Sequence, residues 1–426
     1  FRALGVRTII LDHHLPPEGE LPPAAAIVDP WLKNSNYPFP NICGCTLAYK
    51  FACALRQDFP AELTEGFLKW QLDLVAISTV ADMMEMRGEN RPLVHFGLQV
   101  LKKTRRPGLS ALLRLAGLKI DELGAGSLGF SVGPRLNAAG RLGDNRPVYD
   151  LLTATDPAEA ERLARQIEQL NRERQELVEA TLLTAEATLW RQNQASDFIY
   201  VLCGNDWPTG VIGLVAGRLA EKYYRPVVVG SQVAGKVRAS VRSIGRYPVI
   251  DGLTAARARL EHFGGHRQAA GLTADVANWE VFTTELKEHA RRYFAGVLPR
   301  QSLTADDFLP LAEASLELAG QISTLEPHGL GNPRPTFIVR DVQIKDAQPI
   351  GRARNHLRLT LIEGTHRLPA IGFSLAEKFL AHKSNRADAI GHLTENIWNG
   401  DRSVQFQITD FKRSGSDITE VEITDN

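Results

Sequence analysis

The sequence predicts an α/β protein that ends in a small β-barrel. Three observations support this class: short apolar runs alternate with helical patterns, one very long charged helix lies near the middle, and evenly spaced alternating runs follow position 336. Alternating strands and helices are typical of parallel or mixed sheets, whereas short strands separated by turns favour a barrel. We expect a partial parallel-sheet domain over 1–150, a connecting helix over 151–195, a second α/β domain over 196–300, a barrel over 301–413 and a disordered tail over 414–426.

The composition is that of an ordinary globular protein. A chain of 426 residues with 44% hydrophobic content can bury several cores. Lysine plus arginine and aspartate plus glutamate both number 49, so any basic surface that binds a polyanion must be local. The four cysteines are too few and too irregular for a disulfide framework, which favours a reducing compartment and hence the cytoplasm. We expect neither a signal peptide nor a membrane-spanning segment, since no apolar run is long enough.

A short apolar run near the start ends on three side chains that can bind a metal ion. Thr8–Leu11 predicts a buried inner strand of a parallel sheet, and Asp12, His13 and His14 follow it directly. Ligands bind outside the carboxyl ends of such strands. A carboxylate beside neutral imidazoles suits Mn2+ or Mg2+ acting on a phosphate ester. The alternative is an aspartate and a histidine that only cap the next turn.

Two further polar stretches of this first part are ambiguous on their own. Asp82 follows a predicted helix in a small-residue turn, where it can be a cap or a partner of His13. In the glycine-containing run 129–144, Asn137 and Arg141 can bind phosphate, as can Arg135. The alternative for this run is a helical hairpin turn with solvated arginines.

Elements of a second α/β domain follow a long helix. The helix, over 157–192, would run on the order of 50 Å at about 1.5 Å per residue, which is too long for one small core and suggests a bridge between domains. The next elements are a strand at 198–203, a helix at 211–223, strands at 226–230 and 235–241, and a helix at 252–263. The polar groups of this domain lie in turns. Arg242 and Ser243 end a strand, and Gly264, Gly265 and His266 enter a helical or bent stretch where backbone amides can face an anion, unless the histidine is only structural.

The last region predicts a five-stranded barrel of the OB type, a frequent platform for single-stranded nucleic acids. The expected strands are 336–344, 356–362, 367–373, 389–393 and 403–410, with a small helix near 375–380. Its arginines and one tryptophan can supply phosphate contacts and stacking, or the arginines can simply be solvated; these residues are Arg352, Arg354, Arg358, Arg367, Trp398 and Arg402.

Taken in order, these stretches resemble the DHH phosphoesterase superfamily, and specifically the RecJ single-stranded-DNA 5′-to-3′ exonucleases. The resemblance covers nearly the whole chain. The runs that carry it are Asp12–His14, Thr79–Asp82, Gly133–Arg141, Gly210–Gly213, Arg242–Ser243, Gly264–His266 and Glu326–Pro333. It implies that the first domain is the DHH domain, the second the DHHA1 substrate-binding domain, and the barrel an OB domain that binds DNA.

The resemblance also implies roles for individual residues. Asp12, His13 and Asp82 would bind Mn2+ or Mg2+, and His14 would contact the scissile phosphate. Two cations about 3.5–4 Å apart can activate water and neutralise the leaving oxygen. The DNA strand would be held by Asn137, Arg141, Arg242, Ser243, Gly264, Gly265 and His266.

The resemblance has limits. The family's first two acidic motifs precede the DHH motif, and the chain begins at Phe1, so we expect this chain alone to be weakly active or inactive. Single-stranded DNA is the implied substrate, with a single-strand-binding protein and a helicase as further candidate partners. The alternatives are a phosphodiesterase for short oligonucleotides or cyclic dinucleotides, and an inactive single-strand-binding scaffold.

Overall fold

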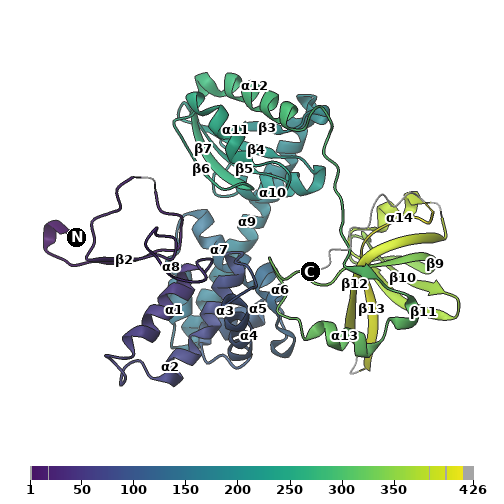
Figure 1. Ribbon diagram of the computed structural model, residues 1–426, viewed down its shortest axis with the longest axis horizontal. Helices are drawn as coiled ribbons and strands as arrows, with labels where there is room; N and C mark the ends of the chain where they lie inside the picture. The colour runs from purple at the N-terminus through teal and green to yellow at the C-terminus, as the bar shows by residue number, and fades with distance from the viewer. Residues whose placement is uncertain (1, 18, 383, 399–400, 416–426) are drawn as a thin grey trace. The chain divides into compact units, whose positions relative to one another are not determined.

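The structure, a computed structural model, describes residues 2–17, 19–382, 384–398 and 401–415 (Figure 1). Most of the tail predicted over 414–426 lies outside these ranges. Backbone contacts divide the chain into two compact units, one made of Phe1–Leu101 with Ser302–Asn426 and the other of Lys102–Gln301. The boundaries of the five predicted domains stay a prediction. No helix in the described ranges is both long and apolar enough to cross a membrane.

The first unit opens on a 3-10 turn (Arg2–Leu4) and two short parallel strands, β1 (Ile9–Leu11) and β2 (Ala26–Val28). The predicted parallel strand before Asp12 is therefore confirmed. Its predicted burial is wrong, because Ile9 is 55% exposed and the described part of the chain offers β1 only one partner strand. Strand β2 lies in the proline-rich segment that follows His14.

Helices follow these strands. They are α1 (Gly44–Leu55), α2 (Glu65–Trp70), α3 (Leu72–Ala81) and α4 (Asn90–Leu101). The apolar side chains of α3 are buried on most sides, as expected for a central helix. Helix α4 crosses α3 closely at Gly97, where a Cβ atom would lie 2.3 Å from the carbonyl oxygen of Leu72. The predicted turn before Asp82 is wrong, since Thr79–Ala81 belong to α3.

The barrel of the first unit is confirmed. Its strands follow the order β10–β11–β13–β12–β9, and a β10–β9 pairing closes it. Leu357, Leu359 and Leu361 alternate with exposed or half-buried neighbours along β10 and fill the barrel core. The elements of this region are β8 (Asp307–Phe308), a 3-10 turn (Leu311–Glu313), α13 (Leu316–Ser323), β9 (Phe337–Ile350), β10 (His356–Glu363), β11 (His366–Gly372), α14 (Ala376–His382), β12 (Arg386–Trp398) and β13 (Asp401–Arg413).

The second unit begins with helices that pack along the long helix α9 (Pro157–Arg191). Helix α9 starts where the Asp156 side chain accepts a hydrogen bond from the Glu159 amide at 2.8 Å, and it confirms the predicted helix. The glycine-containing run 129–144 is helical over most of its length. The preceding elements are α5 (Pro107–Leu115), a 3-10 turn (Ile120–Glu122), α6 (Ala125–Ser127), a π-helical turn (Leu128–Val132), α7 (Gly133–Leu142) and α8 (Arg146–Thr153).

A 5-stranded sheet in the order β3–β4–β5–β7–β6 completes this unit, with apolar clusters on both faces. The helix predicted over 252–263 is confirmed only up to Ala255, because a 3-10 turn follows and His262–Gly265 form an edge strand paired with β7. The elements are a 3-10 turn (Gln194–Ser196), β3 (Tyr200–Asn205), α10 (Ile212–Tyr223), β4 (Val227–Val233), β5 (Lys236–Arg242), α11 (Val249–Ala255), a 3-10 turn (Arg257–Arg259), β6 (His262–Gly265), β7 (Ala269–Asp275) and α12 (Val276–Tyr293).

Candidate functional site

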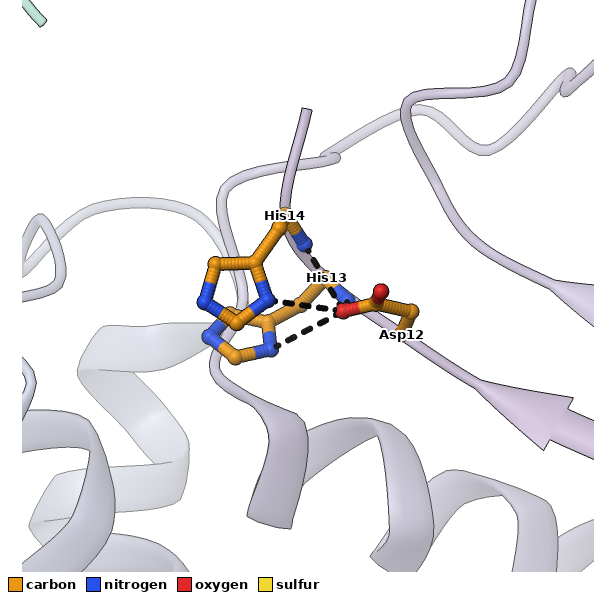
Figure 2. A group of neighbouring side chains, drawn as sticks. All are labelled: Asp12, His13 and His14. Carbon is orange, nitrogen blue, oxygen red and sulfur yellow. Dashed lines mark hydrogen bonds and ion pairs between the residues drawn. The ribbon is translucent and has the colours of Figure 1, made fainter. Parts of the chain in front are cut away.

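Asp12, His13 and His14 gather at the carboxyl end of β1 (Figure 2). One carboxylate oxygen, Asp12 Oδ1, accepts hydrogen bonds from the amides of His13 at 2.7 Å and His14 at 3.2 Å. The His14 Nδ1 atom lies 2.8 Å from the same oxygen, as the dashed line in Figure 2 shows. One potential ligand atom from each of the three residues lies within 4.8 Å of those of the other two. The structure therefore brings the three predicted ligands together.

Asp82 joins this group from the end of α3. Its Oδ2 atom lies 3.2 Å from Nε2 of His13. Asp82 is the C-terminal cap residue of α3, and Met83 turns the chain away with a φ of 57°. The predicted partnership of His13 and Asp82 is thus present, although a helix end presents Asp82 rather than a small-residue turn.

The imidazole of His13 rests on the first turn of α1. A Cβ atom on Gly44 would lie 3.2 Å from His13 Nδ1, so only a glycine lets the helix approach the ring without displacement. The His13 side chain is 19% exposed, whereas that of His14 is 75% exposed. His13 is consequently held in place, and His14 faces solvent.

A buried hydrogen-bond network beneath the cluster was not anticipated from the sequence. Thr46 of α1 and Thr79 of α3 place their hydroxyl oxygens 3.3 Å apart, and the thiol of Cys43 lies 3.3 Å from Thr46 and 3.6 Å from Thr79. This network joins the helix that supports His13 to the helix that ends in Asp82. A single threonine in an apolar run carries no sequence signal for such a role.

The electrostatics of the cluster favour a cation. The hydrogen bond from the His14 ring holds the pKa of Asp12 below its ordinary value of 3.8, the two backbone amides lower it further, and partial burial opposes them. Asp12 is therefore a carboxylate at neutral pH. Two carboxylates and two imidazoles form a donor set that suits Mn2+, and the carboxylates also suit Mg2+. The residues present thus fit a divalent metal ion.

In the second unit, the half-buried arginines Arg141, Arg174 and Arg242 gather, and within the described residues none of them forms an ion pair with a carboxylate. Burial lowers the pKa of Arg141 of α7 and that of Arg242 of β5, and the positive charge of Arg141 lowers the latter further. Arg141 also donates a 3.4 Å hydrogen bond to the carbonyl of Gly210, and Arg242 donates to the Ser240 hydroxyl at 3.1 Å. Half-buried cationic groups that lie this close together form a site that an anion would stabilise.

Arg174 of α9 belongs to the same cluster, and the sequence analysis missed it. Burial lowers its pKa, with Arg141, Arg218 and Arg135 adding to the shift. Within the described residues its Nε atom is buried without a hydrogen-bond partner. In a helix with so many surface charges, periodicity alone does not single out this arginine. Arg135, by contrast, is neutralised by Glu168 at 2.7 Å, which favours a structural role over phosphate binding.

The other predicted substrate residues of this unit lie near these arginines. Asn137 is exposed on α7, one helical turn before Arg141 and on the same face. The Ser243 amide donates to the carbonyl of Gln268 at 2.8 Å, and the His266 amide donates to that of Ala269 at 2.8 Å. Ser243 therefore lies beside the β6–β7 turn that carries His266.

The two glycines of this stretch are strand residues. Gly264 and Gly265 belong to β6 and pair with Gly271 and Ala270 of β7. Gly265 has a φ of 145°, and a Cβ atom there would lie 2.3 Å from the carbonyl oxygen of Ala269. The glycine at this position is thus required by the hairpin itself, whatever it binds.

Comparisons with known proteins agree with this architecture. The chain matches the family models described as "DHH family, N-terminal domain" over residues 1–79, "DHHA1 domain" over 195–292 and "RecJ OB domain" over 305–410. It is 34% identical to the single-stranded-DNA-specific exonuclease RecJ of Bacillus subtilis, over 96% of this chain and 51% of that protein. It is 32% identical to RecJ of Haemophilus influenzae, over 95% of this chain and 73% of that protein.

Solved structures give the same result. The crystal structure of RecJ from Thermus thermophilus in complex with Mn2+ matches with a TM-score of 0.82 and 28% identity, over 97% of this chain and 59% of that chain. A structure of exonuclease RecJ bound to manganese matches with a TM-score of 0.54 and 32% identity, over 68% of this chain and 70% of that chain. The chain spans about half the length of the Bacillus relative. With these relatives and this order of domains, the chain belongs to the RecJ family.

Proposed function

We propose that this chain carries the catalytic and DNA-binding parts of a divalent-metal-dependent exonuclease that degrades single-stranded DNA from 5′ to 3′ in recombination and repair. The main observation behind this proposal is that Asp12, His13 and His14 cluster at the carboxyl end of β1 and that Asp82 reaches His13 from the end of α3. The names of the relatives support the substrate and the reaction, since they are single-stranded-DNA-specific exonucleases. The polarity is supported by the resemblance alone.

We propose a different role for each residue of the cluster. Asp12, His13 and Asp82 would hold Mn2+ or Mg2+, the ions bound in two Thermus RecJ structures. A bound divalent ion supplies polarisation of the phosphoryl oxygen and a more acidic water. His14 would contact the scissile phosphate, because its exposed ring is anchored through Nδ1 to Asp12 and its Nε2 atom faces outward from that bond. Anchoring one imidazole nitrogen fixes the orientation of the other.

The second unit would hold the strand by its phosphates. Arg141 and Arg242, with Arg174 beside them, form the cationic cluster, and Asn137 extends it along α7. Ser243, Gly264, Gly265 and His266 at the end of the sheet would add further hydrogen-bond donors. The barrel would bind the strand further along, as OB folds do by stacking and backbone contacts.

The direct test is degradation of a 5′-labelled single strand by this chain with and without Mn2+, calibrated with the Bacillus relative. His13→Ala should abolish both degradation and Mn2+ binding while the affinity for the strand is retained. His95→Ala is the matched control, because this exposed histidine of α4 contacts only Gln99 and Phe96 among the interactions of the described residues. Unchanged Mn2+ affinity in His13→Ala would exclude the assigned metal site. A chain that binds the strand but neither binds Mn2+ nor cleaves would instead be a scaffold.

Two finer predictions accompany this proposal. A single-strand-binding protein and a helicase are suggested as partners by the resemblance, and pull-downs with purified proteins test them. The cytoplasmic location rests on the sparse cysteines of the sequence.

A further inference from the structure

The run Glu326–Pro333 has no role in the site described above, yet it forms a highly ordered loop. The Asn332 side-chain amide donates hydrogen bonds to the carbonyls of Leu325 at 3.0 Å and Pro327 at 2.9 Å. The backbones of Gly329 and Asn332 exchange two hydrogen bonds, at 2.9 and 3.1 Å. We name Leu325–Asn332 the docking loop. Its internal bonds hold its shape without help from its neighbours.

The docking loop contacts the chain segment that follows Asp82. The Met86 amide donates to the carbonyl of Leu330 at 2.6 Å, and Arg87 Nε donates to that of Gly331 at 2.8 Å. Arg91 adds a 3.1 Å hydrogen bond to the carbonyl of Leu325. Each contact uses a backbone carbonyl of the loop as acceptor, so the loop offers a fixed set of acceptors to one short segment.

The fit between loop and segment is tight enough to require glycine. A Cβ atom on Gly329 would lie 2.7 Å from Cγ of Met86, whose side chain is only 3% exposed. Gly331 has a φ of 76°, and a Cβ atom there would lie 3.0 Å from Arg87 Nε. Any side chain at these positions would push the loop away from Met86 and Arg87.

The contacted segment is continuous with Asp82. Two residues after Asp82, the Met84 amide donates a hydrogen bond to the carbonyl of Thr79 in α3 at 3.0 Å. Further along the chain, the buried side chain of Asn90 donates a hydrogen bond to the carbonyl of Glu85 at 3.0 Å. The turn from Asp82 to Met86 is thus held at α3 on one side and by the docking loop on the other, with no regular secondary structure of its own.

We propose that the docking loop is a positioning element for Asp82. By holding Met86 and Arg87, it fixes the turn after α3 and so the separation between the Asp82 carboxylate and His13. The proposal rests on the proposed function of Asp82 as a metal ligand. It also gives the segment leading into the barrel a second task, which is to keep the metal site assembled. A loop that served only to pack the barrel would leave the affinity for Mn2+ unchanged when loosened.

The test compares Gly329→Ala with Gly320→Ala, a control in α13 where a Cβ atom would meet nothing within 4 Å. Two quantities are measured on the whole chain: hydrogen exchange of the Met84 and Met86 amides, and Mn2+ affinity by electron paramagnetic resonance. Residues that orient metal ligands typically contribute about tenfold or more to metal affinity. We expect Gly329→Ala to speed exchange at both amides and to weaken Mn2+ binding about tenfold, while Gly320→Ala changes neither. Arg87→Ala, which removes one hydrogen bond from an exposed side chain, serves if Gly329→Ala does not fold, and Arg87→Lys should restore part of the affinity.

The outcomes separate the two levels of the proposal. Faster exchange with unchanged Mn2+ affinity overturns the positioning role and leaves the proposed function standing. Unchanged exchange and affinity in both loop variants also overturns the positioning role. Absence of Mn2+ binding in the unmodified chain overturns the metal site of the proposed function, and with it the inference that rests on that site.

Discussion

The Nε2 atom of His13 lies 3.2 Å from Oδ2 of Asp82, although 69 positions separate the two residues. The opposite ring nitrogen, Nδ1, lies 4.0 Å from Oδ1 of Asp12, so the ring stands between two carboxylates. The hydrogen bond between Thr46 and Thr79 ties together the helices below it. Bringing the ligands together therefore depends on helix packing as well as on the three-residue motif.

Gly44→Ala should lower metal affinity without lowering stability. The new Cβ atom would lie 3.2 Å from Nδ1 and 3.4 Å from Cε1 of His13, so the ring must shift by a few tenths of an ångström. Alanine in a helix is favoured over glycine by about 1 kcal/mol, which offsets the strain in the folded state. The measurement is the Mn2+ concentration at half-maximal binding, by electron paramagnetic resonance, together with the melting temperature. Gly66→Ala in α2, where a Cβ atom would meet nothing within 4 Å, is the control. A half-maximal concentration equal to that of the control would show that His13 is not held against α1.

His328→Phe should leave the protein at least as stable at neutral pH and make it less sensitive to acid. Both ring nitrogens of His328 are buried, and neither has a hydrogen bond of acceptable geometry within the described residues. Burial lowers the pKa of His328 below its ordinary value of 6.5; Arg334 and Arg91 add to the shift, while Glu326 and the Asn332 backbone oppose it. The unfolded chain therefore binds the proton more readily, and the free energy of unfolding falls as the pH drops through 6.5.

Phenylalanine has no titratable group, so it removes the contribution of His328 to the pH dependence of the free energy of unfolding. The difference in melting temperature between His328→Phe and the parent should grow as the pH is lowered from about 7.5 to about 5.5, a range that spans the ordinary histidine pKa. The pKa of His289 is also lowered, but His289 is present in both proteins and cancels in the difference. A difference independent of pH would mean that His328 has the same pKa in the folded and unfolded states.

Arg141→Gln should weaken binding of a single strand and flatten its dependence on salt. Each phosphate contact on a single strand contributes about 0.7 to the slope of log affinity against log salt concentration. A charged hydrogen bond contributes about 1.5 kcal/mol or more, which corresponds to a loss of about tenfold in affinity. Arg165→Gln in α9 is the control, because this exposed arginine is paired with Glu161. Fluorescence anisotropy at several salt concentrations gives both quantities, and equal slopes for the two variants would remove Arg141 from the binding surface.

Replacing the exposed arginines Arg352, Arg354 and Arg358 by alanine should weaken binding of long strands more than cleavage of very short ones. These side chains lie in the β9–β10 turn and on β10, outside the barrel core. The fold should be retained, because the core of apolar residues is untouched. Competition between long and dinucleotide substrates measures the effect. Equal losses for both lengths would place these arginines outside the strand-binding surface.

Sequence periodicity predicted those elements in which each residue's environment follows from its neighbours along the chain. The alternation of Leu357, Leu359 and Leu361 identified a barrel strand, and the length of the charged helix that follows Asp156 was evident from its pattern. Asp12, His13 and Asp82 were grouped correctly because a strand end and a familiar motif pointed to one place. Their roles as metal ligands remain predictions.

What the sequence could not show depends on partners distant along the chain. Phe263 lies in an edge strand only because β7 offers it a free row of hydrogen-bonding groups, and local propensity gives no sign of that neighbour. Ile9 is exposed although its run is apolar, since burial requires a covering element that a local pattern does not reveal. Arg174 gains importance from its partial burial and from the arginines that other helices bring near it.

Because Met86, Arg87 and Arg91 bind main-chain carbonyls of the docking loop, the interface depends on few of the loop's side chains, namely the Asn332 amide that shapes the loop and the glycines Gly329 and Gly331. A foreign barrel would therefore keep this interface only if the docking loop is retained and the new barrel also covers Leu309, Leu311, Ala319 and Ile322, which pack in the present barrel core. Chimaeras made in this way would keep the contacts to the segment after Asp82, and the same principle would let barrels be exchanged between proteins of the same architecture.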